Sequence, residues 1–385
     1  MDIEAIIQHC EDLYNDLDFR YVKDWKQKHQ AKAIGFMPVY VPRELIHAAG
    51  MLPVGIMGGG DSIEIISGDS YFQSYICRIP RSTIELGVSG RLNFLDGLLF
   101  PAICDVIRNL SGMWKILFPD KYVKYLDFPQ NFTESGRIFY RKELGQLAGD
   151  LENISGHQIT KANLQRAIEL YNQNRRVIRE LYDLRCRLPH KVPTYELYLL
   201  MRVSNILEVE EHTALLQNYL AAAQQTDRPE RDYVKVIVSG AFCEQPPLNL
   251  IKALESSGCY IVDDDWVLGA RYQLQDVPLT DEPLEALLES YFANTVATAS
   301  RHEEAVDKGR FLLQCVKERQ AEGVIFCAPS FCDPALLERP MLQAALSDAK
   351  VPYTSFMYAE NTGQIHVIKE QTGTFADSIK LWGGV

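Results

Sequence analysis

Three features of exported, membrane-spanning or nucleotide-hydrolysing proteins are missing from this sequence. The opening MDIEAIIQHCEDLYNDLD carries acids from its second residue and has no basic segment before an apolar run, so we expect no secretory signal. The most apolar stretches, such as LDGLLFPAICDVI, are short and contain Asp96, Pro101 and Asp105, so none should cross a bilayer. No GxxxxGK[ST] phosphate loop is present. These absences predict a cytoplasmic protein without an ATP site of that kind.

Positive charge is also scarce, and this bears on the partners. The net charge of -12 makes nucleic acid and anionic membranes poor partners, because neither favours an acidic surface. The 47% hydrophobic and 23% charged content is that of a folded globular protein. At 385 residues the chain exceeds the size of one core, so we expect two domains and connecting helices.

The nine cysteines form no compact CxxC pattern and are odd in number. Without an export signal they argue for reduced thiols, some of which are candidates to hold metal. Cys104 and Cys332 each precede an aspartate that can cap a following helix, and a thiolate at a helix N-terminus has a lowered pKa. Arg78 and Arg81 favour a thiolate at Cys77 in the same way. From spacing alone, these cysteines could equally well be buried as small apolar side chains.

Two series of apolar strands alternating with helices surround a long helical stretch. The first series contains AIGFMPVYV, LPVGIMG, LDGLLFPA and YVKYLDF, and the second contains VKVIVSG, CYIVDD, GVIFCAP and VPYTSFM. This alternation predicts an α/β fold with a mainly parallel sheet in each half. We expect a helical arm over 1–30, beginning with one amphipathic helix over 2–27, and then a first α/β domain over 31–133. A helical connector over 134–230 and a second α/β domain over 231–385 complete the expected organisation.

The two series resemble divergent copies of one plan. In each, the third strand follows an acid–glycine pair, Asp96–Gly97 or Glu322–Gly323, and leads into Cys–Asp before a helix. Ligands of open α/β sheets collect beyond the carboxyl ends of the strands. Cys104 and Cys332 are therefore expected where sites are built.

Several segments resemble a known family in the order in which they occur. MPVYVPRELIHAAGMLPVGIMGGG, YICRIPRSTIELG and LDGLLFPAICDVIRNLSGMW are similar to the first domain of the 2-hydroxyacyl-CoA dehydratase and benzoyl-CoA reductase family. GCYIVDDDWVLGARY, AEGVIFCAPSFCDP and NTGQIHVIKEQTGTFADSI resemble its second domain. Within the family, SYICRIPRSTIELG, FCEQPPLNLIK and SFCDPALLERPM are most similar to the benzoyl-CoA reductase branch. The resemblance implies two Rossmann-like or flavodoxin-like domains joined by a helical segment.

The resemblance further implies a [4Fe–4S] cluster held by the cysteines of the YIC, CD and FCDP segments. These are Cys77, Cys104 and Cys332 here. Cys327 competes as the third ligand, but Cys332 directly precedes the Asp–Pro of the motif. Three thiolates leave one iron without a protein ligand, and that position can take water, sulfide, substrate or a ligand from a partner.

The implied reaction is the reduction of the aromatic ring of benzoyl-CoA to a cyclohexadiene-carboxyl-CoA in anaerobic aromatic catabolism. The implied partners are a homologous B subunit, two activator subunits A and D that carry ATP, magnesium and their own iron–sulfur cluster, and ferredoxin as electron donor. This chain and subunits A, B and D would together form a cytoplasmic heterotetramer. No nucleic acid and no membrane is expected.

Other side chains carry weaker signals. Glu44 and His47 share a helix face and could position a proton, or cap and fill that helix. Gly58, Gly59 and Gly60 could bring backbone amides close to a phosphate or the pantetheine arm, although a flexible turn is the commoner reason for such a motif. The acids at 263–265 end a strand, and we interpret them as solvated turn residues without metal.

Three alternatives remain open at this stage. A subunit of an (R)-2-hydroxyacyl-CoA dehydratase would share the fold and the cluster but eliminate water without net electron consumption. A non-catalytic partner would only shape the interface for a substrate-binding paralogue. A two-lobed solute-binding protein fits the architecture but lacks the expected export signal.

Overall fold

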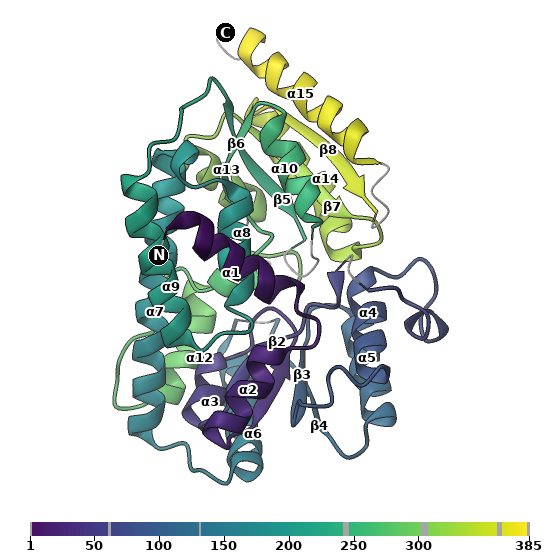
Figure 1. Cartoon of the computed structure of the whole chain (residues 1–385), viewed down its shortest axis with the longest axis vertical. Coiled ribbons are helices and arrows are strands. Elements are labelled where there is room, and N and C mark those ends of the chain that lie inside the picture. Colours follow the sequence, from purple (N-terminus) through teal and green to yellow (C-terminus); the bar gives the residue numbers. More distant parts are fainter. Residues whose placement is uncertain are drawn as a thin grey trace.

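The computed structural model of the chain describes residues 2–60, 63–130, 132–241, 246–301, 307–359 and 364–382. Two four-stranded parallel sheets with flanking helices confirm the predicted α/β fold (Figure 1). The first sheet has the order β2-β1-β3-β4 and the second β6-β5-β7-β8. The strands are β1 (Ala33–Phe36), β2 (Leu52–Gly55), β3 (Gly97–Pro101), β4 (Tyr122–Leu126), β5 (Val234–Gly240), β6 (Cys259–Asp264), β7 (Gly323–Pro329) and β8 (Tyr353–Tyr358).

The two sheets repeat the same local device at the start of their central strands. Asp96 accepts a hydrogen bond from the Ala33 amide at 2.8 Å, and Glu322 accepts one from the Lys235 amide at 2.8 Å. In both halves the acid before the third strand therefore binds the start of the neighbouring central strand and helps to hold these two strands in register. This pairing supports the expected relationship between the two halves.

The amino-terminal arm differs from the single helix predicted over 2–27. It consists of α1 (Ile3–Asn15) and α2 (Arg20–His29), because Phe19 has a left-handed backbone with φ of 52°. The Asp16 carboxylate accepts hydrogen bonds from the amides of Asp18 and Arg20, which stabilises this break. The buried side chains of α1 join the core of the second sheet, whereas those of α2 join the core of the first. The arm consequently ties the two halves together.

Four long helices form the central stretch, as predicted. They are α6 (Glu134–Ser155), α7 (Lys161–Arg187), α8 (Thr194–Val203) and α9 (Val209–Gln225). Leu164 and Ile168 of α7 lie in the core of the first sheet, and Ile178 and Leu181 lie in the core of the second. Figure 1 shows α7 running along one side of the molecule between the two halves. This helix makes the two cores one connected unit.

A segment after β6 crosses back to the first half. It contains α11 (Leu268–Arg271) and α12 (Pro283–Asn294), and Leu268, Tyr272 and Tyr291 lie in the first core. Tyr291 contacts the rings of Tyr40 and Phe128 of the first half at centroid distances of 5.7 and 5.5 Å. The domain boundaries proposed at residues 30, 133 and 230 stay predictions. The return of this segment to the first half was not predicted from the sequence.

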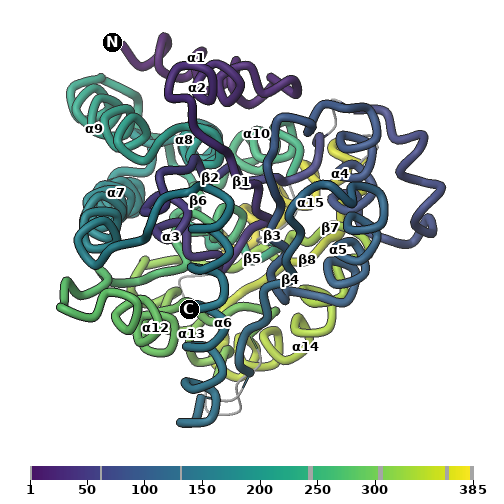
Figure 2. Tube along the Cα trace, turned by 90° about the horizontal axis from the view of Figure 1, so that it is seen from below, coloured from purple at the N-terminus to yellow at the C-terminus, as the bar shows by residue number. Residues whose placement is uncertain are grey.

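The remaining helices cover the sheets. Around the first sheet lie α3 (Arg43–Ala48), α4 (Arg78–Val88) and α5 (Asp105–Leu117), and Figure 2 shows α4 and α5 beside β3 and β4. Around the second lie α10 (Leu248–Ser256), α13 (Lys308–Glu318), α14 (Asp333–Asp348) and α15 (Ile365–Trp382). Helix α13 was not predicted from the sequence. No helix in the described part of the chain has the length and apolar character needed to span a bilayer.

Candidate functional site

Each of the three predicted cluster cysteines is the N-cap residue of a helix. Cys77 precedes α4, Cys104 precedes α5 and Cys332 precedes α14. The prediction that the aspartates cap these helices is wrong by one residue, because Asp105 and Asp333 already belong to the first turn. The aspartates therefore belong to the first helical turn, and each cysteine occupies the N-cap position that precedes the first backbone N–H groups of its helix.

Cys104 and Cys332 occupy equivalent places in the two halves. Pro101 pairs with Leu126 at the end of the first sheet, and Pro329 pairs with Tyr358 at the end of the second. Each cysteine lies three residues after its proline. The thiols of Cys104 and Cys332 are close enough to interact electrostatically. This closeness indicates that the carboxyl ends of β3 and β7 face each other.

The thiol of Cys104 is not the low-pKa group that the sequence predicted. Burial raises the pKa of Cys104, and the nearby Cys332 raises it further. The backbone N–H groups of Ile107 and Val106 act in the opposite direction, as expected at a helix N-terminus, but they do not outweigh burial. The cause is that the Cys104 side chain packs partly buried against the first core, although Asp105, the next residue, is exposed.

Cys77 is held in place by the glycine loop after β2. The Arg78 side chain donates from Nε to the Gly60 carbonyl at 2.8 Å, and the Gly59 amide donates to Ser82 Oγ at 3.2 Å. Gly58 has φ of 68°, and a Cβ there would lie 2.2 Å from Ser82 Oγ. A side chain at Gly58 would therefore displace the first turn of α4, and with it Cys77.

These contacts give the three glycines a packing role next to the candidate cluster. The cavity beside them has a volume of about 40 Å³. It has room for a few water molecules at most, and a pantetheine arm does not fit there. The predicted substrate contact of Gly58, Gly59 and Gly60 stays a prediction.

Cys77, Cys104 and Cys332 do not form a compact ligand set as they stand. Within the described ranges, no group of three His, Cys, Asp or Glu side chains could hold a metal ion. The donor chemistry nevertheless fits an iron–sulfur cluster, because three thiols stand at three helix N-termini whose N–H groups favour negative charge.

Cys327, the competing ligand, lies inside β7. It is fully buried in the second core, and burial together with Asp265 raises the pKa of its thiol well above the ordinary value. Cys10 and Cys259 are likewise core residues. Cys243 lies outside the described residues. The placement of Cys327 supports the preference for Cys332.

Glu44 and His47 face α7. Glu44 is 1% exposed and forms an ion pair with Arg175, which also donates to Asn172 at 2.9 Å. The His47 ring lies edge-on to Tyr171 with 6.0 Å between centroids. These contacts favour the structural role that the sequence left open, and the catalytic role of both residues stays a prediction.

A cavity of about 400 Å³ lies at the carboxyl ends of β5, β6 and β7. Its walls include Ser239 and Gly240 of β5, residues of α13, and Ala335, Glu338 and Leu342 of α14. It is thus built against the first turns of the helix whose N-cap is Cys332. The volume is that of a small-molecule site, and the strand ends are where open α/β sheets bind ligands.

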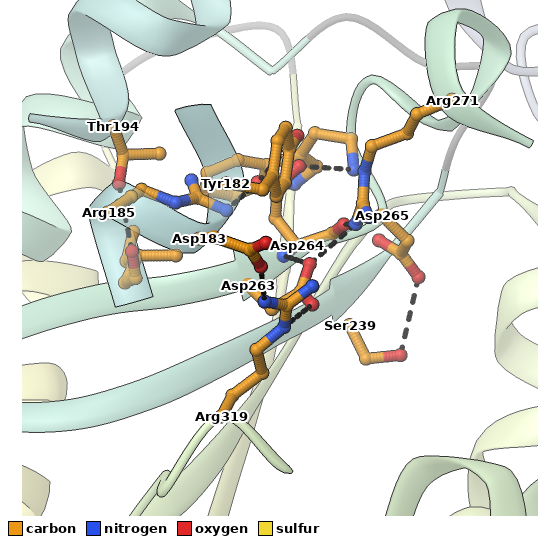
Figure 3. A network of polar contacts seen from close by, with 12 residues as sticks. Tyr182, Asp183, Arg185, Thr194, Ser239, Asp263, Asp264, Asp265, Arg271 and Arg319 are labelled. Carbon is orange, nitrogen blue, oxygen red and sulfur yellow. Dashed lines mark hydrogen bonds and ion pairs between the residues drawn. The ribbon is translucent and has the colours of Figure 1, made fainter. Parts of the chain in front are cut away.

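The acids at 263–265 line this cavity and are not the solvated turn residues that the sequence predicted (Figure 3). Asp263 is bound by Arg271 at 2.5 Å and Arg319 at 3.0 Å, and Asp264 by Arg185 at 2.8 Å. Asp263 and Asp264 are 7% and 4% exposed. Burial raises the pKa of Asp263, but the guanidinium groups outweigh it and the net shift is downward.

Asp265 is the acid of this group for which the described residues provide no ion pair. Its carboxyl group accepts from the Gly240 amide at 2.7 Å and from Ser239 Oγ at 3.4 Å. Burial raises the pKa of Asp265 to about 7, and the charge of Asp264 adds to the increase. The sequence contained a signal for this site that was given too little weight. Three successive acids directly end an apolar strand, and Arg271 follows a few residues later.

Comparison with known proteins places this architecture in a family. The family described as 2-hydroxyglutaryl-CoA dehydratase, D-component, matches residues 38–379. The C subunit of benzoyl-CoA reductase from Thauera aromatica is 56% identical over 385 residues, covering 99% of this chain and 100% of that protein. The beta subunit of (R)-2-hydroxyglutaryl-CoA dehydratase of Acidaminococcus fermentans is 31% identical, covering 92% and 94%. The beta subunit of (R)-phenyllactyl-CoA dehydratase of Clostridium sporogenes is 28% identical, covering 87% and 88%.

These similarities extend over both sheets, the connecting helices and all three N-cap cysteines. The match over 38–379 leaves out the amino-terminal arm, β1 and the last residues. The resemblance seen in the sequence motifs is therefore confirmed. The chain is an enzyme subunit and belongs to the 2-hydroxyglutaryl-CoA dehydratase D-component family.

Proposed function

We propose that this chain is the C subunit of an ATP-dependent, ferredoxin-linked benzoyl-CoA reductase, an oxidoreductase of anaerobic aromatic catabolism. The observation that carries the proposal is the 56% identity to the Thauera aromatica reductase subunit over 99% of the chain. The dehydratase beta subunits reach only 31% and 28%. The reaction adds two electrons and two protons to the aromatic ring of benzoyl-CoA and yields a cyclohexadiene-carboxyl-CoA.

In this proposal Cys77, Cys104 and Cys332 hold one [4Fe–4S] cluster at the junction of the two halves. The cluster, when bound, supplies one-electron transfer at low potential. The helix N-termini of α4, α5 and α14 stabilise the thiolates, and the glycine loop fixes the first turn of α4. Three cysteine ligands leave one iron open for another ligand.

The driving force would come from partner subunits. The sequence has no GxxxxGK[ST] loop, and the relatives are themselves named as subunits. We infer that a homologous B subunit completes the reducing module, that activators A and D bind ATP with magnesium, and that ferredoxin supplies electrons. The assembly is proposed to work in the cytoplasm.

The test is anaerobic purification of this chain with its three partner subunits, followed by iron and sulfide analysis. The four-subunit complex should reduce benzoyl-CoA only when reductant and ATP are both present. The chain alone should show neither ATPase activity nor ring reduction. Ring reduction by the single chain with ferredoxin and no ATP would contradict this division of labour.

A dehydratase subunit is the second candidate, because the matching family model and two relatives carry dehydratase names. An (R)-2-hydroxyacyl-CoA dehydratase would release water without net consumption of electrons. Turnover of (R)-2-hydroxyacyl-CoA by the full complex, with no loss of benzoyl-CoA, would move the assignment to that branch. Turnover that survives loss of this chain's cluster would instead indicate a non-catalytic partner.

The cluster assignment has its own test in paired cysteine substitutions. Cys332→Ser, Cys104→Ser and Cys77→Ser should each abolish or alter the cluster signal in electron paramagnetic resonance. Cys327→Ser is the matched control, because it changes a buried thiol five residues away inside β7. Loss of the cluster in Cys327→Ser with retention in Cys332→Ser would reverse the ligand assignment.

A further inference from the structure

The cavity of about 400 Å³ in the second half has no role in the cluster chemistry described so far. It opens at the carboxyl ends of the two strands, β5 and β7, between which the strand order reverses. Its wall on α14 begins at Ala335, one turn from the N-cap at Cys332. A ligand in this cavity would therefore lie next to the helix that carries a candidate cluster ligand.

The lining favours a ligand that is largely apolar. Leu274, Val296, Phe311 and Leu342 supply an apolar surface, and three of the four cations that line the cavity are already paired. Arg339 lines the cavity without an ion pair among the described residues, so its guanidinium group can donate to a neutral carbonyl oxygen. Lys308 is paired with Glu338 at 2.5 Å, and Arg271 and Arg319 are held by Asp263. An aromatic ring and its thioester carry no charge and match this wall.

Asp265 stands at the polar end of the cavity with its carboxyl group oriented by β5. The Gly240 amide and Ser239 hydroxyl bind its two oxygens at 2.7 and 3.4 Å. The charged and titratable groups around it are Asp264 at the end of β6, Arg271 of α11, Glu338 on α14 and Cys327 on β7. Burial and the neighbouring carboxylates raise its pKa to about 7, so the acid form is present at neutral pH.

We propose that this cavity binds the aryl-thioester end of the substrate and that Asp265 donates a proton to the reduced ring. The proposal rests on the proposed function and assigns substrate binding to this chain. The ring accepts two electrons from a low-potential iron–sulfur donor and two protons. One proton leaves the Asp265 carboxyl group as a new C–H bond forms, and water restores it to the resulting carboxylate. The second proton comes from solvent.

Binding of benzoyl-CoA to the anaerobic complex tests the location. Ala335→Phe fills the cavity from α14 and should weaken binding, measured by titration calorimetry, by about tenfold or more. Ala344→Phe places the same ring on the exposed face of the same helix and should bind like the wild type. Iron content and unfolding midpoint should be equal in both variants. Equal affinity and stoichiometry in Ala335→Phe and wild type would overturn the proposal and assign the acyl group to the homologous subunit.

Asp265→Asn tests the proton. The amide still accepts from Gly240, so binding should stay within about threefold of the wild type. Ring reduction should fall by about 100-fold or more, as when a general acid is removed, and the ionisation near neutral pH should vanish from the rate profile. Infrared difference spectra should lose one titrating carboxyl band. An unchanged rate and pH profile would refute the role of Asp265.

Assays of the wild-type complex distinguish failure of the proposed function from failure of this binding site. Wild-type reduction of benzoyl-CoA together with unaffected Ala335→Phe and Asp265→Asn variants would retain the proposed function and reject this site. A wild-type complex that neither binds nor reduces benzoyl-CoA would reject both.

Discussion

The buried ion pair between Glu44 and Arg175 gives a direct test of whether Glu44 is structural or catalytic. Glu44 is 1% exposed and Arg175 is 7% exposed. Arg175 also donates to Asn172, whose amide group binds the Val277 carbonyl at 2.7 Å and whose oxygen accepts from the Val277 amide at 2.9 Å. The pair thus connects α3, α7 and the segment before α12.

Glu44→Gln removes the negative charge and leaves the guanidinium buried. Breaking one partner of such a pair typically costs about 3–5 kcal/mol, which is a large part of a total stability of about 5–15 kcal/mol. The double variant Glu44→Gln/Arg175→Met removes both charges and should recover about 2 kcal/mol or more relative to the sum of the single variants. The non-additivity is the signature of direct coupling.

The assay is urea unfolding followed by fluorescence of the four tryptophans, with activity of the folded complex measured in parallel. The control is Glu285→Gln, which removes an ion pair with Arg141 in which the side chains are 37% and 44% exposed. That change should cost less than about 1 kcal/mol. Unchanged stability of Glu44→Gln together with a loss of ring reduction would refute the structural interpretation and restore the catalytic one.

Three further predictions concern the backbone and acid stability. Gly58→Ala should lower the free energy of unfolding and the cluster content, because its Cβ would lie 2.2 Å from Ser82 Oγ. The control is Gly50→Ala, at φ of 71° and with open space around it, which should lower the free energy of unfolding by only about 1–2 kcal/mol. Phe331→Gly should raise the urea midpoint, because φ of 69° is strained for an aromatic residue, and an unchanged or lower midpoint would contradict this. Burial lowers the pKa of His212 to about 4, so stability present above pH 6.5 should fall by about 3 kcal/mol as the pH drops to about 4. His212→Gln should flatten that part of the pH profile, and an unaltered acid profile would argue against this histidine.

The sequence by itself determined the strands, the helical centre and the family. All eight apolar runs became strands, because each is bounded by turn residues or helix starts. The central strands β1, β3 and β7 are buried throughout, whereas the edge strands β4 and β8 are only partly buried. The acid–glycine pairs predicted the repeat, and the structure shows why they recur: Asp96 and Glu322 each bind the amide at the start of a central strand. Such features depend on neighbours in sequence or on a regular sheet register.

Tertiary structure alone decided the features that depend on distant contacts. Nothing local indicates that Tyr291 packs in the first core, that Glu44 meets Arg175, or that Asp263 is neutralised by Arg319. The same holds for Cys104, whose pKa rises because its thiol is partly buried against the first core, although its helix position favours the opposite shift. Periodicity and capping act over a few residues along the chain. Burial and charge pairing depend on which segments the fold brings together, and these set the chemistry of the site.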